Sequence, residues 1–256
     1  MNKRADILRL RQTLARAGLP PDRPPRPLGV AAADAALGGG LLPGALHEVF
    51  AADWSAGGFA ACLAILMTGD KPLFWVRPDY EAAEYGGLHA AGLLELGGRP
   101  DRLFLVRAAD AAGALSAGAD ILSCPHVGAL VLELSGHPAA LDAVAGRRLA
   151  FLSARNGVTT LLLRAGAAAL PSPAQTRWHA AAAPTHGPDL GGDDWGRPAF
   201  RAELLRNRAG PTGQWTFTWS PDDGCFHPAA QDRHAPHPGR VAAAASHRPA
   251  DARRAG

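Results

Sequence analysis

Short apolar runs alternate with alanine-rich segments between residues 46 and 165, and this alternation limits the folds that the chain can adopt. The apolar runs are expected strands at residues 46–50, 73–77, 103–107, 129–134 and 158–164. The expected helices lie between them, at residues 59–68, 81–96, 110–122 and 139–155. Apolar strands separated by segments long enough for right-handed crossovers are typical of a buried parallel sheet. The pattern therefore predicts a doubly wound α/β domain.

The pattern changes after Pro171, where the segments AFRAELLRNR and QWTFTW are joined by the turn-forming run AGPTG. In QWTFTW, Trp215, Phe217 and Trp219 alternate with two threonines and so share one face of a strand. We expect an antiparallel hairpin at the edge of the sheet. The predicted fold class is therefore a doubly wound, mostly parallel α/β sheet with antiparallel C-terminal edge strands.

The aromatic face of this hairpin has two interpretations. Trp215 and Trp219 are candidates for stacking single-stranded DNA bases or for contacting a partner. The neighbouring strand carries Arg201, Arg206 and Arg208. A stripe of aromatic residues at strand spacing is more often part of a core.

The first 27 residues form a basic segment outside the α/β pattern. Apolar residues at 7, 10, 14 and 17 have helical spacing, and the proline-rich run LPPDRPPRP follows. This predicts an amphipathic helix on a stiff linker. Its candidate contacts with DNA phosphates or a partner are Arg4, Arg9, Arg11 and Arg16. The plainer interpretation is a solvated helix face.

Length and composition favour one globular core at residues 28–226, between the basic segment 1–27 and a poorly apolar tail at 227–256. The chain has 256 residues and is 47% hydrophobic, with a net charge of only +3. It has neither a long apolar run nor a signal-peptide core. Cys62, Cys124 and Cys225 are widely separated. We expect a cytoplasmic protein with free thiols and a disordered tail.

Metal binding and covalent catalysis have little support in the sequence. The chain has ten histidines, and those in or near the tail are His227, His234, His237 and His247. Their spacing matches no zinc pattern, and the cysteines lack zinc-ligand spacing. The serines are not framed by a G-x-S-x-G elbow. We predict no metal site, no cofactor and no catalytic residue.

The most informative segment is LGVAAADAALGGGLLPGALHEVFAADWSAGGFAACLAIL, at residues 28–66. It resembles the opening of a RecA-type ATPase core, with a glycine turn, a strand, a loop of small residues and then a helix. In such enzymes the loop is the P-loop, whose backbone amides and helix N-terminus bind phosphates. Turnover also requires a lysine for the phosphates and a hydroxyl for Mg²⁺.

Both of those side chains are missing from the corresponding loop, AADWSAGGF. Ala51 or Ala52 stands where the first glycine belongs, Gly57 precedes the lysine position, Gly58 replaces the lysine and Phe59 replaces the hydroxyl residue. Without the lysine and the metal ligand, the transferring phosphoryl group loses its stabilisation. The loop therefore predicts a pseudo-ATPase.

Three further residues are candidates in this region. Trp54 either fills the vacated nucleotide pocket or is an exposed anchor for a partner. Glu133 lies near the end of an expected strand, where an ATPase keeps a metal-facing carboxylate, although a surface carboxylate is an equal alternative. After the strand LFWVR, no catalytic base can be assigned, and Asp79 or Glu81 would be a guess.

Within the RecA superfamily, the chain resembles the ImuA family. The resemblance covers about residues 5–226, and the late run RAELLRNRAGPTGQW favours this family most strongly. It implies a non-catalytic scaffold in translesion synthesis during the SOS response. The implied partners are an ImuB-type polymerase-like protein and a DnaE-type error-prone polymerase, with RecA as a further candidate and DNA bound directly or through partners. The N-terminal helix resembles in position the arm that joins RecA protomers.

Two alternatives remain open at this point. An active RecA-type or KaiC-type ATPase would need a lysine from elsewhere, and Lys71 is the plausible donor. A cell-division inhibitor of the SulA type would also be a binding protein. The length, the basic arm and the five-strand alternation favour the ImuA family over it.

Overall fold

A computed structural model describes residues 23–185 and 196–229 of the chain. Its strands are β1 (Leu46–Ala51), β2 (Leu73–Pro78), β3 (Leu103–Ala108), β4 (Ala129–Glu133), β5 (Thr159–Ala165), β6 (Thr176–Ala183), β7 (Ala199–Asn207), β8 (Gly213–Ser220) and β9 (Cys225–Pro228). The helices are α2 (Ala31–Leu37), α3 (Gly57–Thr68), α4 (Asp79–Tyr85), α5 (Ala90–Glu95), α6 (Ala111–Leu122) and α7 (Ala143–Asn156). Two 3₁₀ turns are η1 (Trp54–Ala56) and η2 (Pro100–Arg102).

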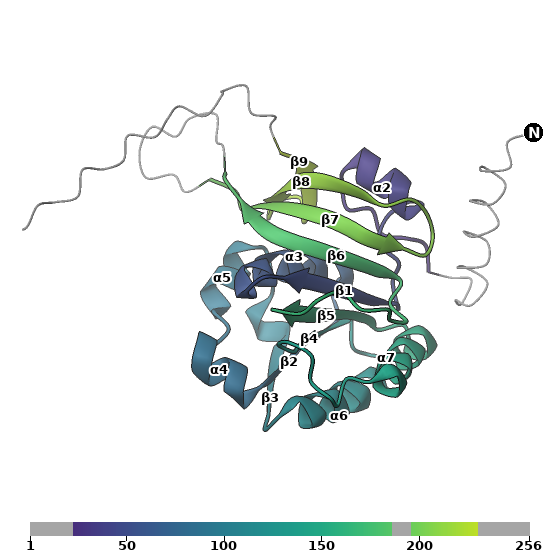
Figure 1. The fold of residues 1–256 in the computed structure, drawn as a ribbon. Coiled ribbons are helices and arrows are strands. Elements are labelled where there is room, and N and C mark those ends of the chain that lie inside the picture. The colour runs from purple at the N-terminus through teal and green to yellow at the C-terminus, as the bar shows by residue number, and fades with distance from the viewer. Residues whose placement is uncertain (1–22, 186–195, 230–256) are drawn as a thin grey trace, which may run out of the picture.

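The described strands form one sheet in the order β3-β2-β4-β5-β1-β6-β7-β8-β9 (Figure 1). The first six strands in this order, from β3 to β6, pair in parallel. Strands β7, β8 and β9 follow β6, and each pairs antiparallel with the strand before it. The predicted fold class is confirmed. The strand β6 was not predicted, because its run of alanines lacks the β-branched residues that mark the other strands.

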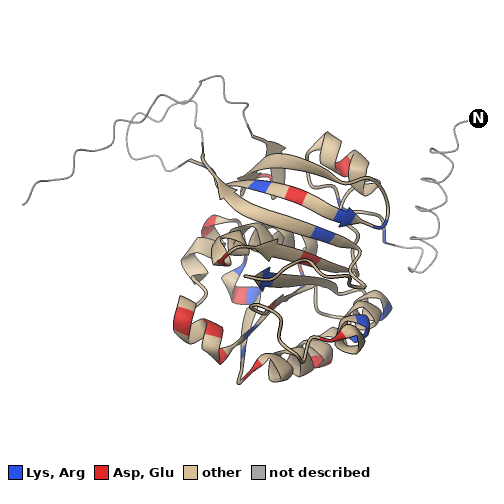
Figure 2. Ribbon diagram, in the orientation of Figure 1, with Lys and Arg blue, Asp and Glu red and all other residues tan. Residues whose placement is uncertain are grey.

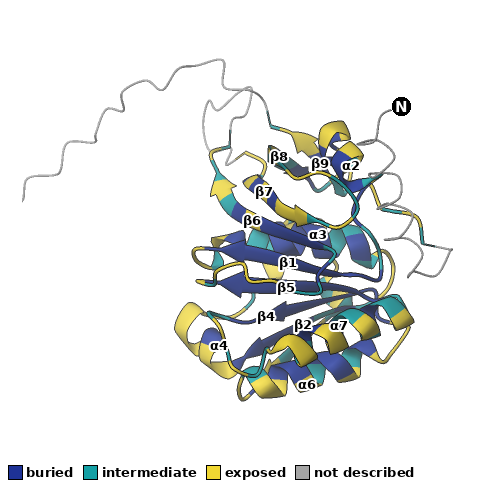
Figure 3. Ribbon diagram, turned by 45° about the vertical axis from the view of Figure 1, so that its right-hand side comes forward, coloured by how far each residue is buried: buried dark blue, intermediate teal, exposed yellow. Residues whose placement is uncertain are grey.

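Helices cover both faces of the parallel part of the sheet. Helix α3 packs on β2, β4 and β5, while α6 and α7 lie on the opposite face (Figures 1 and 3). Strands β1, β4 and β5 are buried along their whole length. This double coverage explains why their sequences are apolar runs rather than alternating patterns.

The single helix predicted over residues 81–96 is wrong. The structure has two short helices, α4 and α5, separated by a segment that begins at Gly86 with a φ of 81°. Glycine adopts this backbone angle readily, whereas other residues are strained there. The carbonyl of Gly86 accepts a 2.8 Å hydrogen bond from the Arg77 side chain. An uninterrupted helix would use most of its carbonyls internally.

Helix α7 begins later than the predicted residue 139 because Asp142 is its N-cap. The Asp142 carboxylate accepts hydrogen bonds from the amides of Val144 and Ala145, at 2.8 and 2.7 Å. Asp110 caps α6 in the same way, through the amide of Gly113. A side-chain acceptor satisfies amides that the first helical turn leaves free.

Residues 23–27, which the sequence assigns to the linker, pack on the core. Arg26 and Leu41 form a β-bridge through two backbone hydrogen bonds of 2.8 Å. The Arg23 guanidinium lies directly over the backbone of Gly157. The predicted N-terminal helix and most of the predicted tail lie outside the described residues. Strand β9 continues to Pro228, within the predicted tail.

No helix in the described ranges has both the length and the apolar composition that crossing a membrane requires.

A buried chain of hydrogen bonds joins β1 to β6 and contains a neutral histidine. His47 Nδ1 lies 2.7 Å from Thr176 Oγ1, and its Nε2 lies 2.9 Å from the carbonyl oxygen of Leu42. Because that carbonyl only accepts, Nε2 carries the proton and Nδ1 accepts from the threonine. The Trp178 indole in turn donates to Thr176 Oγ1. Burial lowers the pKa of His47 from 6.5 to about 4.

This shift predicts a pH-dependent stability. The unfolded chain binds a proton at His47 more readily than the folded chain does. The stability contributed by neutral His47 is therefore complete above pH 6.5 and is lost as the pH falls towards 4. The shift corresponds to about 3 kcal/mol. Burial also raises the pKa of Glu48, which acts in the opposite direction. We therefore expect His47→Gln to flatten the pH slope of the unfolding free energy relative to the wild type, measured by urea denaturation.

The matched control is His126→Gln, because His126 is exposed. It should retain the wild-type slope. Identical slopes for His47→Gln and the wild type would contradict the assignment.

Candidate functional site

The loop between β1 and α3 lies at the carboxyl edge of the parallel strands, where an ATPase of this fold binds phosphates (Figure 1). Ala51 is buried at the end of β1, and Ala52 is exposed. The next residue, Asp53, accepts a 2.8 Å hydrogen bond from the amide of Ser55, and bonds from Ser55 lower the pKa of Asp53. The loop therefore presents a carboxylate, which repels phosphate. The sequence analysis did not single out Asp53.

The position of the missing lysine faces the hydrophobic core. A Cβ atom added to Gly58 would lie 3.2 Å from the ring of Phe200 on β7. A lysine there would have to displace that ring before it could reach a phosphate. The preceding residue, Gly57, faces open space, with no atom within 4 Å of an added Cβ.

The position of the missing hydroxyl is the centre of an aromatic cluster. Phe59 is 0% exposed, and four aromatic rings surround it at centroid distances of 5.6 to 6.1 Å. They belong to Trp178, Phe200, Phe217 and Phe226. These rings come from β6, β7, β8 and β9 in turn. Phe59 thus packs α3 against the antiparallel part of the sheet.

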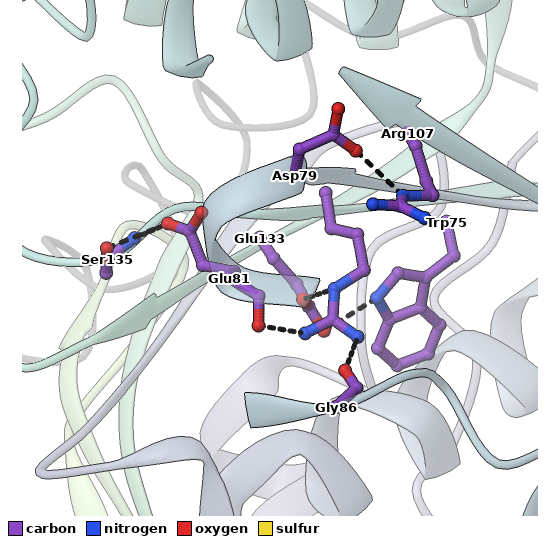
Figure 4. A network of polar contacts seen from close by, with 8 residues as sticks. Trp75, Asp79, Glu81, Gly86, Arg107, Glu133 and Ser135 are labelled. Atoms are coloured by element: carbon purple, nitrogen blue, oxygen red, sulfur yellow. Dashed lines mark hydrogen bonds and ion pairs between the residues drawn. The ribbon is translucent and has the colours of Figure 1, made fainter. Parts of the chain in front are cut away.

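Glu133, the candidate metal-facing carboxylate, is buried in an ion pair with Arg77 (Figure 4). The register that pairs Val76 with Leu132 brings these two side chains together. Glu133 Oε2 lies 2.9 Å from Arg77 Nε, and Oε1 accepts a 2.7 Å hydrogen bond from the Trp75 indole. Burial raises the pKa of Glu133, and the charge of Arg77 opposes that rise. Oε1 therefore has a hydrogen-bond donor, and Oε2 contacts its counter-charge.

The rest of the Arg77 guanidinium is also engaged. Its two terminal nitrogens donate to the carbonyls of Gly86 and Glu81, at 2.8 and 3.3 Å (Figure 4). The Glu81 side chain points elsewhere and accepts hydrogen bonds from the amide and hydroxyl of Ser135. Asp79 pairs with Arg107 at the surface, at 2.7 Å. Asp79 is thus engaged at the surface, and the Glu81 carboxylate is held by Ser135, although its charge still acts on Glu133.

A cavity of about 250 Å³ lies between the loop and this buried pair. Trp54 and Tyr85 flank it with ring centroids 5.6 Å apart, and Arg77 and Glu133 lie in its wall. This cavity is smaller than most small-molecule sites, which measure about 300–1,000 Å³. The half-buried Trp54 lines this cavity.

Lys71 lies far from the loop. It precedes β2, so it is at the amino edge of the parallel strands, whereas the loop is at their carboxyl edge. A six-residue strand spans about 17–20 Å. The Lys71 ammonium donates a 3.0 Å hydrogen bond to the carbonyl of Pro125.

The hairpin of β7 and β8 turns its aromatic face inward, so base stacking on this face is wrong for the described structure. Phe217 and Trp219 are 0% exposed, and the Trp219 indole donates to the carbonyl of Leu96. Trp215 is half-buried and contacts Trp178. Arg201 is exposed on the opposite face, next to Thr216 in register. The aromatic and basic side chains therefore do not form one surface.

Basic residues lie on the outer side of β7 and along α7 (Figure 2). Arg4, Arg9, Arg11 and Arg16 lie outside the described residues.

Comparisons with known proteins identify the family. No family model matches the chain. Protein ImuA of Caulobacter vibrioides strain NA1000 / CB15N is 35% identical over 224 residues, covering 80% of this chain and 82% of the relative. Protein ImuA of strain ATCC 19089 / CIP 103742 / CB 15 gives the same values. The chain belongs to the ImuA family.

The fold comparison is consistent with this ImuA assignment. A crystal structure of the RadB recombinase is similar to this chain with a TM-score of 0.53, covering 76% of this chain and 96% of that chain. At 16% identity, this likeness shows the fold alone. The predicted family and the predicted RecA-like fold are both confirmed.

The buried ion pair predicts a large cost for removing one partner. Arg77→Met should lower the unfolding free energy by about 3–5 kcal/mol, because it leaves Glu133 buried without its cation. The double variant Arg77→Met, Glu133→Gln should recover much of this loss. Urea denaturation near neutral pH measures both effects.

Arg107→Met is the matched control, because Arg107 lies beside Arg77 in register but pairs at the surface. It should change stability by less than about 1 kcal/mol. Equal losses at the two arginines would contradict a special role for the buried pair.

Proposed function

We propose that this chain is a non-catalytic accessory protein of translesion mutagenesis. It acts as a scaffold for an ImuB-type polymerase-like protein and a DnaE-type error-prone polymerase, with RecA as a further partner. DNA is reached directly or through those proteins. Membership of the ImuA family and the RecA-like fold support this role.

One observation carries the non-catalytic part of the proposal. The groups that an ATPase would use at this edge of the sheet are committed to packing and ion pairing. Phe59 is the centre of an aromatic cluster, and Glu133 is engaged by the Arg77 charge and the Trp75 indole. Phosphoryl transfer depends on positioned cations and a metal ion, and the described loop positions no cation for this.

The alternative of an active ATPase has a weaker structural basis. It required Lys71 to reach the loop, and Lys71 lies at the other edge of the sheet. Arg77, the nearest buried cation to the cavity, is held by Glu133 and two carbonyls. Recruiting Arg77 to a phosphate would leave the Glu133 carboxylate buried and unpaired.

We expect the purified protein to release no phosphate from ATP above the buffer background, with or without single-stranded DNA. Lys71→Ala should behave identically, since this lysine has no catalytic part. A malachite-green assay with active RecA as a positive control measures this. DNA-stimulated release that Lys71→Ala abolishes would return the chain to the active ATPases.

The scaffold role is tested in cells. A strain that lacks this gene should lose damage-induced mutagenesis, and the wild type and Lys71→Ala should restore it equally. Normal induced mutation frequency in the deleted strain would contradict the proposal. Filamentation on overexpression, with no effect on mutagenesis, would instead favour the SulA-type alternative.

Removing residues 1–22 tests the N-terminal arm without disturbing the bridge between Arg26 and Leu41. If this segment joins protomers or RecA, the shortened chain should fold but lose at least about tenfold in affinity in a pull-down, as expected when a basic contact segment is removed. Unchanged retention of RecA and of a second copy of the chain would contradict this role.

A further inference from the structure

Three different donor atoms converge at the turn between β8 and β9. The Asp223 carboxylate lies 2.9 Å from His227 Nε2, and Cys225 Sγ lies 3.8 Å from the same nitrogen. One ligand atom from each residue lies within 4.8 Å of the others. In the described part of the chain, no second group of three such side chains meets this condition.

The backbone explains the convergence. Cys225 and His227 are two residues apart on β9 and therefore project from the same face of the strand. Asp223 lies in the preceding turn, where Gly224 has a φ of 60° and its amide donates to the carbonyl of Ser220. The Ser220 hydroxyl holds the Asp223 carboxylate at 2.7 Å.

The layer beneath these side chains is buried and packed. Phe226, between the two β9 donors, is 0% exposed and packs edge-on against Trp219, with centroids 4.8 Å apart. The amide of Phe226 donates to the carbonyl of Leu28, which ties β9 to the N-terminal loop. The donors therefore stand on a fixed strand rather than on a free chain end.

A thiolate, an imidazole and a carboxylate form a ligand set that suits zinc. Zinc bonds of about 2.0–2.3 Å in a tetrahedron place ligand atoms about 3.3–3.6 Å apart. The observed 2.9 and 3.8 Å lie on either side of this range, and the Asp223 and Cys225 ligand atoms lie within 4.8 Å of each other. Three protein ligands leave the fourth position for water or another donor.

The local charge also suits a cation. Asp34 acts electrostatically on Cys225 from the N-terminal side, and Asp222 adjoins the turn. Arg197 is the cation beside the turn, and it is engaged with Asp222 at 3.2 Å and with the Ser220 hydroxyl at 2.8 Å. Its charge also acts on Asp223, less strongly than the hydrogen bonds from Ser220 and His227.

We propose that Asp223, Cys225 and His227 form a zinc site that clamps the β8–β9 turn. Binding replaces the Cys225 thiol proton with a metal–sulfur bond and releases that proton to solvent. Because Phe226 also contacts Phe59, the clamp stabilises the outer end of the aromatic cluster. The site is separate from the degenerate loop and does not depend on the proposed function.

The test is a zinc titration of the full chain after chelator treatment, followed by calorimetry and thermal unfolding. Cys225→Ala and His227→Ala should each lower the zinc affinity at least about tenfold, because even residues that only support a metal ligand change affinity by this much. Zinc should raise the melting temperature of the wild type more than that of either variant. Cobalt should give a thiolate charge-transfer band that Cys225→Ala abolishes.

The matched controls are Cys124→Ala and His126→Ala. These two exposed residues have the same two-residue spacing but no third ligand beside them. They should bind zinc as the wild type does. Absence of zinc binding by the wild type would overturn the proposal, as would equal binding by the Cys225 and His227 variants, which would leave only the Asp223–His227 hydrogen bond.

Discussion

The ion pair between Arg77 and Glu133 determines what the carboxyl edge of this sheet can do. Both charges are buried, and their nearest atoms are 2.9 Å apart. The Trp75 indole and the carbonyls of Glu81 and Gly86 complete the network. Two buried charges are tolerated only when each is neutralised and hydrogen-bonded, so neither is free for another role. Glu133, the carboxylate at the end of β4, is therefore part of the core.

The same change of role occurs at the first turn of α3. Phe59 replaces a metal-binding hydroxyl and packs among aromatic rings from β6 to β9, while Gly58 leaves space for Phe200. Helix α3 is therefore fixed by apolar contacts on the side where nucleotide would otherwise order the loop. These contacts hold the RecA-like framework together at this edge of the sheet.

The sequence predicted the framework well because buried parallel strands are unmistakable apolar runs, and all five predicted strands are present within one residue at each end. It failed where tertiary contacts decide the structure. The break at Gly86 depends on a hydrogen bond from Arg77, and β6 depends on pairing with β1 and β7. The loss of the lysine and hydroxyl was visible in the sequence. The ion-pair partner of Glu133 could not be seen in the sequence, because Arg77 is 56 residues away and only the sheet register brings it near.

A crystal structure of the full chain grown with Mg²⁺ and a non-hydrolysable ATP analogue tests most directly whether the nucleotide site has been converted into core. We expect an intact Arg77–Glu133 pair, Phe59 within its aromatic cluster and no nucleotide between Trp54 and Tyr85. A bound analogue in the loop, with Glu133 turned from Arg77 towards the metal ion, would contradict it.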